Sequence, residues 1–267
     1  MVGIYLGANP ISMGAPVQEV YVGSTQVWPP LPTASFSELV LAKGCIGYWK
    51  MNQTVSTAAC ADSSVLGNTL SIDGGSFLVN QAPLMNENGS VQCSGGRYSS
   101  QLSTLGNWDT TPTFTVLAWL NLDINPVDSS HHWCQYGDSD QNNWAWQMLA
   151  RPLNGERARL VTNNTSNITE NFASVDNAIV PGVTTLCCIT FSNATQTFKI
   201  WKNGVPFGTG AMTNPWKITP GGRKYFSLGG RKGTTNGPWI GRMSNLAVLD
   251  YEPTDQEALD FYNAGKL

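Results

Sequence analysis

The sequence is short of charged residues and of long apolar runs, and each shortage excludes a class of protein. Charged residues make up 12% of the 267 residues, and the formal net charge is −3. This balance indicates neither a nucleic-acid-binding surface nor a disordered acidic tail. No apolar run reaches the roughly 18 residues of a membrane-spanning helix. Residues 1–10 lack the basic stretch followed by an apolar one that marks a signal peptide. We expect no nucleic-acid partner and no membrane span.

Groups for catalysis are scarce as well. His131 and His132 are the only histidines, and we expect them in a solvent-facing loop without a third metal ligand. There is no Gly-x-Ser-x-Gly motif to hold a nucleophile. A glycosidase would need two carboxylates placed together, as alternate residues of one strand are. Glu156, Glu170 and Glu252 stand in loop-like contexts without such a partner. We therefore expect a non-enzymatic protein.

The six cysteines are scattered along the chain and form no Cys-x-x-Cys motif. Cys187 and Cys188 are neighbours in a predicted strand, so their side chains should point to opposite faces. This pattern favours reduced cysteines that fill a core over a disulfide framework or a metal site. The cysteines are Cys45, Cys60, Cys93, Cys134, Cys187 and Cys188.

The residues that are abundant indicate an all-β protein. The 27 glycines and 15 prolines are typical of many strands joined by turns. Thr197–Lys202 is rich in aromatic and β-branched residues, as strands are, and Asn203 with Gly204 suits the two positive-φ positions of a type I′ turn. Residues 205–207 start the return strand, in which Pro206 marks a position that needs no ladder N–H. This hairpin must lie in a larger sheet, because an isolated hairpin is marginal in water.

Three further patterns predict other elements of the domain. In Thr113–Leu122 both the even and the odd positions are mostly apolar, which predicts a central strand covered on both faces. Residues 36–43 have apolar side chains at helical spacing and are followed by Gly44, which predicts a short helix that ends at this glycine. Thr254 and Glu257 form a capping box at the start of a second helix, which should end before Gly265.

The first 29 residues contain a short internal repeat. Residues 4–11 return as residues 20–27, and each copy reads as strand, glycine-led turn and strand. Such a module is too small to bury a core alone, so it must lean on a partner or oligomerise. The pattern YLG…VYVGSTQVWP resembles an N-terminal module of virion proteins of tailed bacteriophages; the alternative is an extra hairpin on the main domain. The resemblance implies an anchoring or assembly role for Tyr5, Gly7, Tyr21, Gly23 and Trp28.

The proline-rich stretch at residues 29–32 cannot continue a ladder, so we place a linker at residues 30–35 and the main domain at 36–267. GYWKM at 47–51, ADSS at 61–64, TFTVLAWL at 113–120 and WIGRMSNLAV at 239–248 follow in order, with the hairpin and the capped helix. Together they resemble a laminin-G-like domain of the concanavalin A-like kind. The resemblance implies an antiparallel β-sandwich, or jelly roll, behind a small N-terminal β module and with a short C-terminal helix.

Such a domain could bind carbohydrate through aromatic residues beside turns, which stack on sugar faces. Arg231 could read hydroxyl groups or belong to a basic patch. The alternative is that the aromatic residues close the ends of the jelly roll. The candidate ligand-binding residues are Trp108, Trp133, Trp216, Trp239 and Arg231.

Calcium is the one cofactor that the sequence suggests. Laminin-G-like domains often hold calcium on a rim, and Asp62 matches an acidic residue of the family's opening motif. Asp138, Asp140 and Asn142 have the spacing of oxygen ligands in a calcium loop, without the glycine and glutamate of an EF-hand. Asn245 stands where the family often has an acidic residue, which weakens the case. The alternative is that Asp62 and Asp138 cap turns.

The two resemblances together imply a non-enzymatic structural protein of a bacteriophage virion. The N-terminal module would anchor a homo-oligomer to other virion proteins. The lectin-like domain would act as a capsid decoration, head fibre or tail appendage and grip host-surface glycan. The protein would then reside in the virion, which assembles in the host cytoplasm. A cell-surface or secreted lectin-like adhesion module is the alternative, and a glycan hydrolase is the third. The missing export signal argues against the adhesion module, and the missing carboxylate pair argues against the hydrolase.

Overall fold

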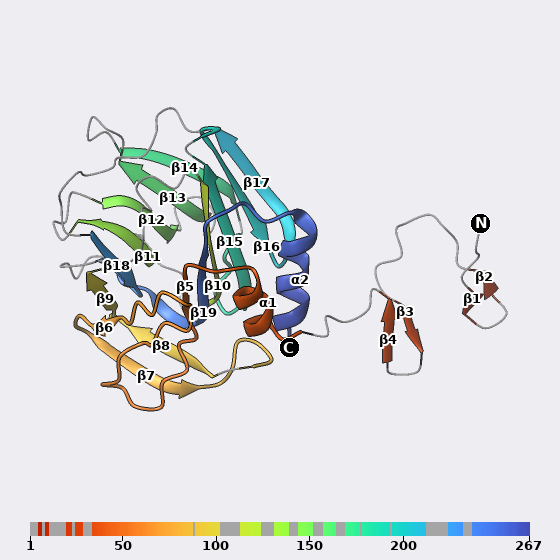
Figure 1. Ribbon diagram of the computed structural model, residues 1–267, viewed down its shortest axis with the longest axis horizontal. Helices are drawn as coiled ribbons and strands as arrows, with labels where there is room; N and C mark the ends of the chain where they lie inside the picture. The colour runs from red at the N-terminus through yellow and green to blue at the C-terminus, as the bar shows by residue number, and fades with distance from the viewer. Residues whose placement is uncertain are drawn as a thin grey trace. The chain divides into compact units, whose positions relative to one another are not determined.

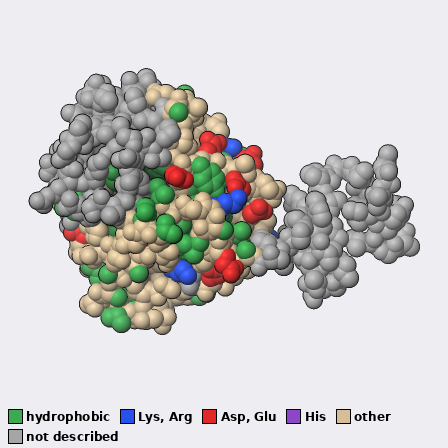
Figure 2. All heavy atoms as spheres, viewed as in Figure 1, with side chains coloured by type: hydrophobic (Ala, Val, Ile, Leu, Met, Phe, Trp, Pro, Cys, Tyr) green, Lys and Arg blue, Asp and Glu red, His purple; other side chains and the backbone are tan. Residues whose placement is uncertain are grey.

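A computed structural model describes most of the chain, and the other residues are grey in Figure 1 and Figure 2. The described residues are 5–6, 9–10, 20–22, 25–28, 34–87, 89–101, 113–123, 131–138, 144–151, 157–163, 169–176, 178–192, 194–211, 224–231 and 237–267. The chain divides into two compact units, residues 1–33 and 34–267. In the first unit one antiparallel strand pair falls in each copy of the repeat (Figure 1). The pairs are β1 (Tyr5–Leu6) with β2 (Asn9–Pro10), and β3 (Val20–Val22) with β4 (Thr25–Trp28).

The second unit is a sandwich of two antiparallel sheets, which confirms the predicted all-β jelly roll (Figure 1). The eight-stranded sheet has the order β17 (Val205–Ala211), β16 (Thr197–Lys202), β15 (Thr185–Ser192), β10 (Thr113–Leu122), β19 (Ile240–Leu249), β8 (Ser90–Ser94) and β7 (Ser76–Gln81), and β5 (Gly47–Trp49) also pairs with β19. The seven-stranded sheet has the order β14 (Thr169–Asp176), β13 (Arg157–Asn163), β12 (Trp144–Arg151), β11 (His131–Asp138), β18 (Lys224–Leu228), β9 (Tyr98–Gln101) and β6 (Ser71–Ile72).

The predicted central strand is confirmed. β10 pairs with β15 on one side and with β19 on the other. Phe114 and Val116 point into the core between the two sheets, whereas Leu117 and Trp119 belong to a second apolar cluster on the opposite face. A strand that is buried on both faces needs apolar side chains at successive positions, which is the pattern of this segment.

Two helices cover the outer face of the eight-stranded sheet. They are α1 (Phe36–Ala42) and α2 (Asp255–Gly265), and each begins with a complete capping box. The ring of Phe36 lies 6.3 Å from the rings of both Trp119 and Phe261, so the two helices and the sheet share one apolar cluster. Figure 1 shows both helices beside this sheet. No helix in the described part of the chain is long and apolar enough to cross a membrane.

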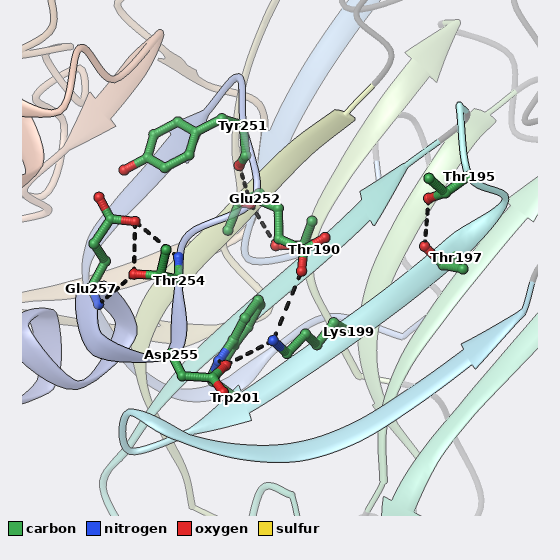
Figure 3. A network of polar contacts seen from close by, with 11 residues as sticks. Thr190, Thr195, Thr197, Lys199, Trp201, Tyr251, Glu252, Thr254, Asp255 and Glu257 are labelled. Atoms are coloured by element: carbon green, nitrogen blue, oxygen red, sulfur yellow. Dashed lines mark hydrogen bonds and ion pairs between the residues drawn. The ribbon is translucent and has the colours of Figure 1, made fainter.

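The predicted hairpin is confirmed, and it also holds α2 in place. Asn203 and Gly204 have φ values of 52° and 76° between β16 and β17. On the outer face of β16, Lys199 Nζ lies 2.7 Å from Asp255 Oδ1, and Trp201 Nε1 donates to the same oxygen at 2.9 Å (Figure 3). Asp255 lies in the first turn of α2, where a negative charge interacts favourably with the helix dipole. The side chain of Asp255 is 59% exposed, so this ion pair is worth at most about 1 kcal/mol.

All six cysteines are buried, which confirms their predicted place in the core. Desolvation raises the pKa of Cys45, Cys60 and Cys187 to about 12. A thiol with so high a pKa is almost entirely protonated at neutral pH, and the thiolate is the reactive form. These cysteines are therefore chemically inert packing residues.

Candidate functional site

The outer face of the seven-stranded sheet carries polar side chains in a regular order. On β11, Gln135 stands between two core residues, Cys134 and Tyr136. Because successive residues of a strand point to opposite faces, Gln135 faces away from the core. On β18, Ser227 stands between two core residues in the same way. Both side chains therefore lie on the face that the helices leave uncovered.

These residues belong to a row that crosses neighbouring strands. Gln135 is opposite Ser227, Ser227 is opposite Ser99 of β9, and Ser99 is opposite Ser71 of β6. We call Ser71, Ser99, Ser227 and Gln135 the polar row. The register continues it to Gln147 of β12. The side chain of Ser71 is exposed, but Ser99, Ser227 and Gln135 are only 5%, 1% and 3% exposed. The row therefore runs from solvent at β6 to a buried centre at β11.

The centre of the polar row contains an unsatisfied acceptor. The Oγ of Ser227 donates to the carbonyl oxygen of Gly230 at 2.9 Å. The Oε1 of Gln135 is buried and has no hydrogen-bond partner among the described residues. Trp133 Nε1 and Trp239 Nε1 are buried donors that also lack a hydrogen-bond partner among the described residues, but those side chains lie in the core. A buried acceptor without a donor costs about 1–3 kcal/mol, so a donor bound at Gln135 would recover that energy.

One ion pair flanks the polar row. Arg97 lies immediately before β9, two residues ahead of Ser99. Its Nε lies 3.4 Å from Asp73 Oδ2, and its Nη2 donates to the Asp73 carbonyl oxygen at 2.8 Å. The two side chains are 13% and 22% exposed. The positive charge beside the row is therefore balanced by a neighbouring carboxylate.

The prediction of a solvent-facing histidine loop is wrong. His131 and His132 start β11 and are 2% and 4% exposed. The Nδ1 atoms lie 2.6 Å from the carbonyl oxygen of Pro238 and 3.0 Å from that of Gly237, respectively. Because a carbonyl only accepts, each Nδ1 donates. Burial lowers the pKa of His131. The two imidazoles hold residues 237–238 against β11 rather than facing solvent.

Two of the candidate sugar-stacking residues lie in the core. Trp133 and Trp239 are fully buried, so neither offers a ring face to a ligand in this structure. The backbone explains their position: Gly229 N–H donates to the Trp133 carbonyl, and Trp239 N–H donates to the Gly229 carbonyl. Arg231 is half-buried, and this burial lowers its pKa. The other two candidates, Trp108 and Trp216, lie outside the described residues.

Asp62 has the contacts of a turn cap. Its Oδ1 accepts hydrogen bonds from the backbone N–H groups of Tyr48 and Ser64, both at 2.8 Å. Its Oδ2 accepts from Ser64 Oγ at 2.9 Å and from Asn68 N–H at 2.7 Å. Asn245 is also buried, and the Tyr48 hydroxyl donates to its Oδ1 at 2.5 Å. These contacts agree with the capping alternative for Asp62.

The remaining candidates can be placed only in part. The backbone of Asp138 ends β11, whereas Asp140 and Asn142 lie outside the described residues. Glu170 lies in β14, so its expected loop-like context is wrong. Over the described ranges, no group of three His, Cys, Asp or Glu side chains could hold a metal ion. Among the assembly residues, Tyr5, Tyr21 and Trp28 lie in β1, β3 and β4, and Gly7 and Gly23 lie outside the described part.

Sequence reasoning missed the polar row because its members are distant in the chain. Ser71, Ser99, Gln135 and Ser227 come from four strands, and only the register brings them together. A local signal was present in β11 and β18: Gln135 and Ser227 are single polar residues between apolar neighbours. Alternation of this kind indicates a strand with one polar face.

Solved structures of a toxin's receptor-binding domain and of two domains in complex with carbohydrate share this fold. The receptor-binding domain of botulinum neurotoxin mosaic serotype C/D has a TM-score of 0.60 at 13% identity, with 83% of this chain and 51% of that chain covered. Domain 4 of AbnA, an extracellular arabinanase from Geobacillus stearothermophilus, in complex with arabinotriose, has a TM-score of 0.57 at 15% identity, with 82% and 98% covered. The CBM40 of the Ruminococcus gnavus IT-sialidase, bound to α2,3-sialyllactose, has a TM-score of 0.51 at 15% identity, with 64% and 94% covered. The chain thus spans about half the length of the toxin domain and nearly all of the two smaller ones.

The family assignment comes from the sequence of the sandwich itself. Among curated proteins, no sequence matches this chain. Residues 94–258, more than half of the chain, match the model of the family described as the concanavalin A-like lectin/glucanases superfamily. The match includes most strands of both sheets and the beginning of α2, and this fold carries carbohydrate-binding domains as well as some glycosidase domains. The chain therefore belongs to the concanavalin A-like lectin/glucanase superfamily.

Proposed function

We propose that the sandwich binds carbohydrate without hydrolysing it, and that the polar row is the binding site. The observation that carries the proposal is the buried, unsatisfied Oε1 of Gln135 on the one outer sheet face that α1 and α2 leave uncovered. Sugar hydroxyls both donate and accept hydrogen bonds, so a row of serine and glutamine side chains suits them. The membership of the superfamily supports the same class of ligand.

The absence of hydrolysis rests on the carboxylates. A retaining glycosidase needs two carboxyl groups about 5–5.5 Å apart, and an inverting one needs them about 6.5–9.5 Å apart. The polar row contains hydroxyl and amide groups only. The acidic residue beside it, Asp73, is paired with Arg97. A ligand at this site would therefore be bound and released unchanged.

The test of this function uses the full chain on a glycan microarray, followed by calorimetry with any glycan that is retained. We expect saturable binding and no shortening of the glycan during overnight incubation. Release of reducing ends would show a hydrolase. Failure of every glycan on the array to bind would refute the carbohydrate-binding function.

We further propose that residues 1–33 anchor the sandwich to a bacteriophage particle. The support is the repeated sequence of this unit, which resembles virion modules, and its short strand pairs, whose open edges suit pairing with another chain. Many copies on one particle would make weak glycan contacts effective through avidity. In that setting the sandwich would serve as a head decoration, head fibre or tail appendage.

Cryo-electron microscopy of virions of a phage that encodes this chain tests the anchoring role. Density for the sandwich on the capsid, with residues 1–33 against the shell, would identify a head protein. Density at the tail would identify an appendage that meets the host surface. Absence of the chain from the particle would refute the virion role and favour a free or cell-surface lectin-like adhesion module.

A further inference from the structure

The chemistry of the polar row distinguishes between neutral and anionic sugars. All four of its side chains are uncharged, three with hydroxyl groups and Gln135 with an amide. Gln147, the next residue in register, is also an amide residue. An ionised sugar would thus meet no opposite charge within the row itself. Burying a charge without such a partner is far less favourable than burying a hydroxyl that forms hydrogen bonds.

The charge beside the row does not change this conclusion. The guanidinium of Arg97 already faces the Asp73 carboxylate and the Asp73 carbonyl oxygen. Both side chains are largely buried, so an incoming carboxylate would have to compete with a partner that is held next to the arginine. Breaking such a pair leaves a partly buried charge uncompensated. Arg97 is therefore a structural group at the rim, not an anion receptor.

The unsatisfied Oε1 of Gln135 also determines which chemical group of a ligand can contact it. Gln135 Oε1 is an acceptor and needs a donor. An ionised carboxylate or phosphate has acceptor atoms only, whereas every free sugar hydroxyl carries a donor. Because Gln135 is 3% exposed, the group that reaches it must be small, such as a single hydroxyl or hydroxymethyl arm, with the sugar ring outside.

We infer that the polar row recognises a neutral saccharide, and that Gln135 is the residue on which its specificity depends. This inference rests on the proposed carbohydrate-binding function and names the ligand class of the same site. The two carbohydrate complexes with this fold represent the two possibilities, a neutral arabinotriose and an anionic sialyllactose. The described contacts favour the neutral class.

The experiment compares neutral and anionic glycans on one array with the full wild-type chain. The array carries lactose beside α2,3-sialyllactose, arabinotriose, and neutral, uronic-acid-containing and phosphorylated oligosaccharides. We expect retention of neutral glycans only, and no gain in binding when sialic acid is added to a bound neutral core. Retention of anionic glycans alone would overturn the inference but leave carbohydrate binding standing. Retention of none would refute the proposed function itself.

Variants then locate the contact. Gln135→Leu removes the acceptor at nearly constant volume and should weaken binding of the retained neutral glycan about tenfold or more. Gln256→Leu on the exposed surface of α2 is the matched control and should bind like the wild type. Arg231→Ala tests the anionic alternative and should also leave binding unchanged. Equal binding by Gln135→Leu, with its fold verified by circular dichroism, would overturn the role of Gln135, as would a loss confined to Arg231→Ala.

Discussion

Gly204 should be far less tolerant of alanine than Gly44, a glycine with a similar backbone conformation. It has a φ of +76°, and a Cβ added to it would lie 2.7 Å from the Cα of Leu259 and 3.0 Å from the carbonyl oxygen of Ala258, both in the backbone of α2. The left-handed conformation alone costs about 1–2 kcal/mol for alanine. Forcing the helix backbone to move adds about 1–3 kcal/mol, as overpacking of a core does. Gly204→Ala should therefore destabilise the sandwich by about 2–5 kcal/mol.

Gly44→Ala is the matched control for this prediction. Gly44 has a φ of +69°, but nothing lies within 4 Å of an added Cβ. This variant should lose only the part of the stability that comes from the backbone conformation, about 1–2 kcal/mol. Urea unfolding and thermal unfolding, both followed by tryptophan fluorescence, measure the loss of stability in the two variants. At about 2–4 °C per kcal/mol for a domain of this size, the melting temperature of Gly204→Ala should fall further than that of the control by about 2–12 °C. Equal losses in the two variants would refute the steric argument and show that the hairpin turn does not press on α2.

Three other measurements test the contacts described above. Asn86→Ala removes the side-chain hydrogen bond from Nδ2 to the Ala264 carbonyl oxygen, 2.8 Å long, and should lower the free energy of unfolding by about 0.5–1.5 kcal/mol in urea; no change would mean that this helix end is held by other contacts. Burial lowers the pKa of His131, so the unfolded chain binds a proton that the folded chain does not. The contribution of His131 to the free energy of unfolding should therefore be fully present above pH 7 and decrease below about pH 6.5. His131→Gln should make the urea midpoint less dependent on pH between pH 7.5 and 5.5; an unchanged pH dependence would contradict this. Asp62→Ala should lower the melting temperature equally with and without calcium chloride, whereas a calcium-dependent rise in the wild type that the variant lacks would show a metal ligand.

The elements that could be predicted from the sequence are those whose causes are local. The capping box of α2 depends on two residues three positions apart, Thr254 and Glu257. The turn at Asn203 depends on two adjacent residues that accept positive φ. The central strand Thr113–Leu122 depends on an unbroken apolar run. In each case the residues that form the element also carry the signal that predicts it.

The candidate site could not be predicted in this way because its causes are distant in the chain. His131 and His132 read as loop residues, since their partners, Gly237 and Pro238, come more than a hundred positions later. The register shift of β11 between His132 and Cys134 adds a residue to the strand and directs Trp133 inward. A tryptophan beside a turn therefore looks exposed in the sequence and is buried in the fold. Only the pairing of the strands distinguishes a buried tryptophan beside a turn from an exposed one.

The two outer faces of the sandwich differ because their side chains differ. On the eight-stranded sheet, Leu117, Trp119 and Trp201 form an outer apolar surface, which would be costly to leave in water. The two helices cover it with Phe36 of α1 and Phe261 of α2. On the seven-stranded sheet the polar row needs hydrogen-bonding partners, and an apolar helix face could not supply them. The helices therefore belong on one face and the proposed hydroxyl-bearing ligand would lie on the other, so the same polarity that determines the packing also favours the proposed position of the binding site.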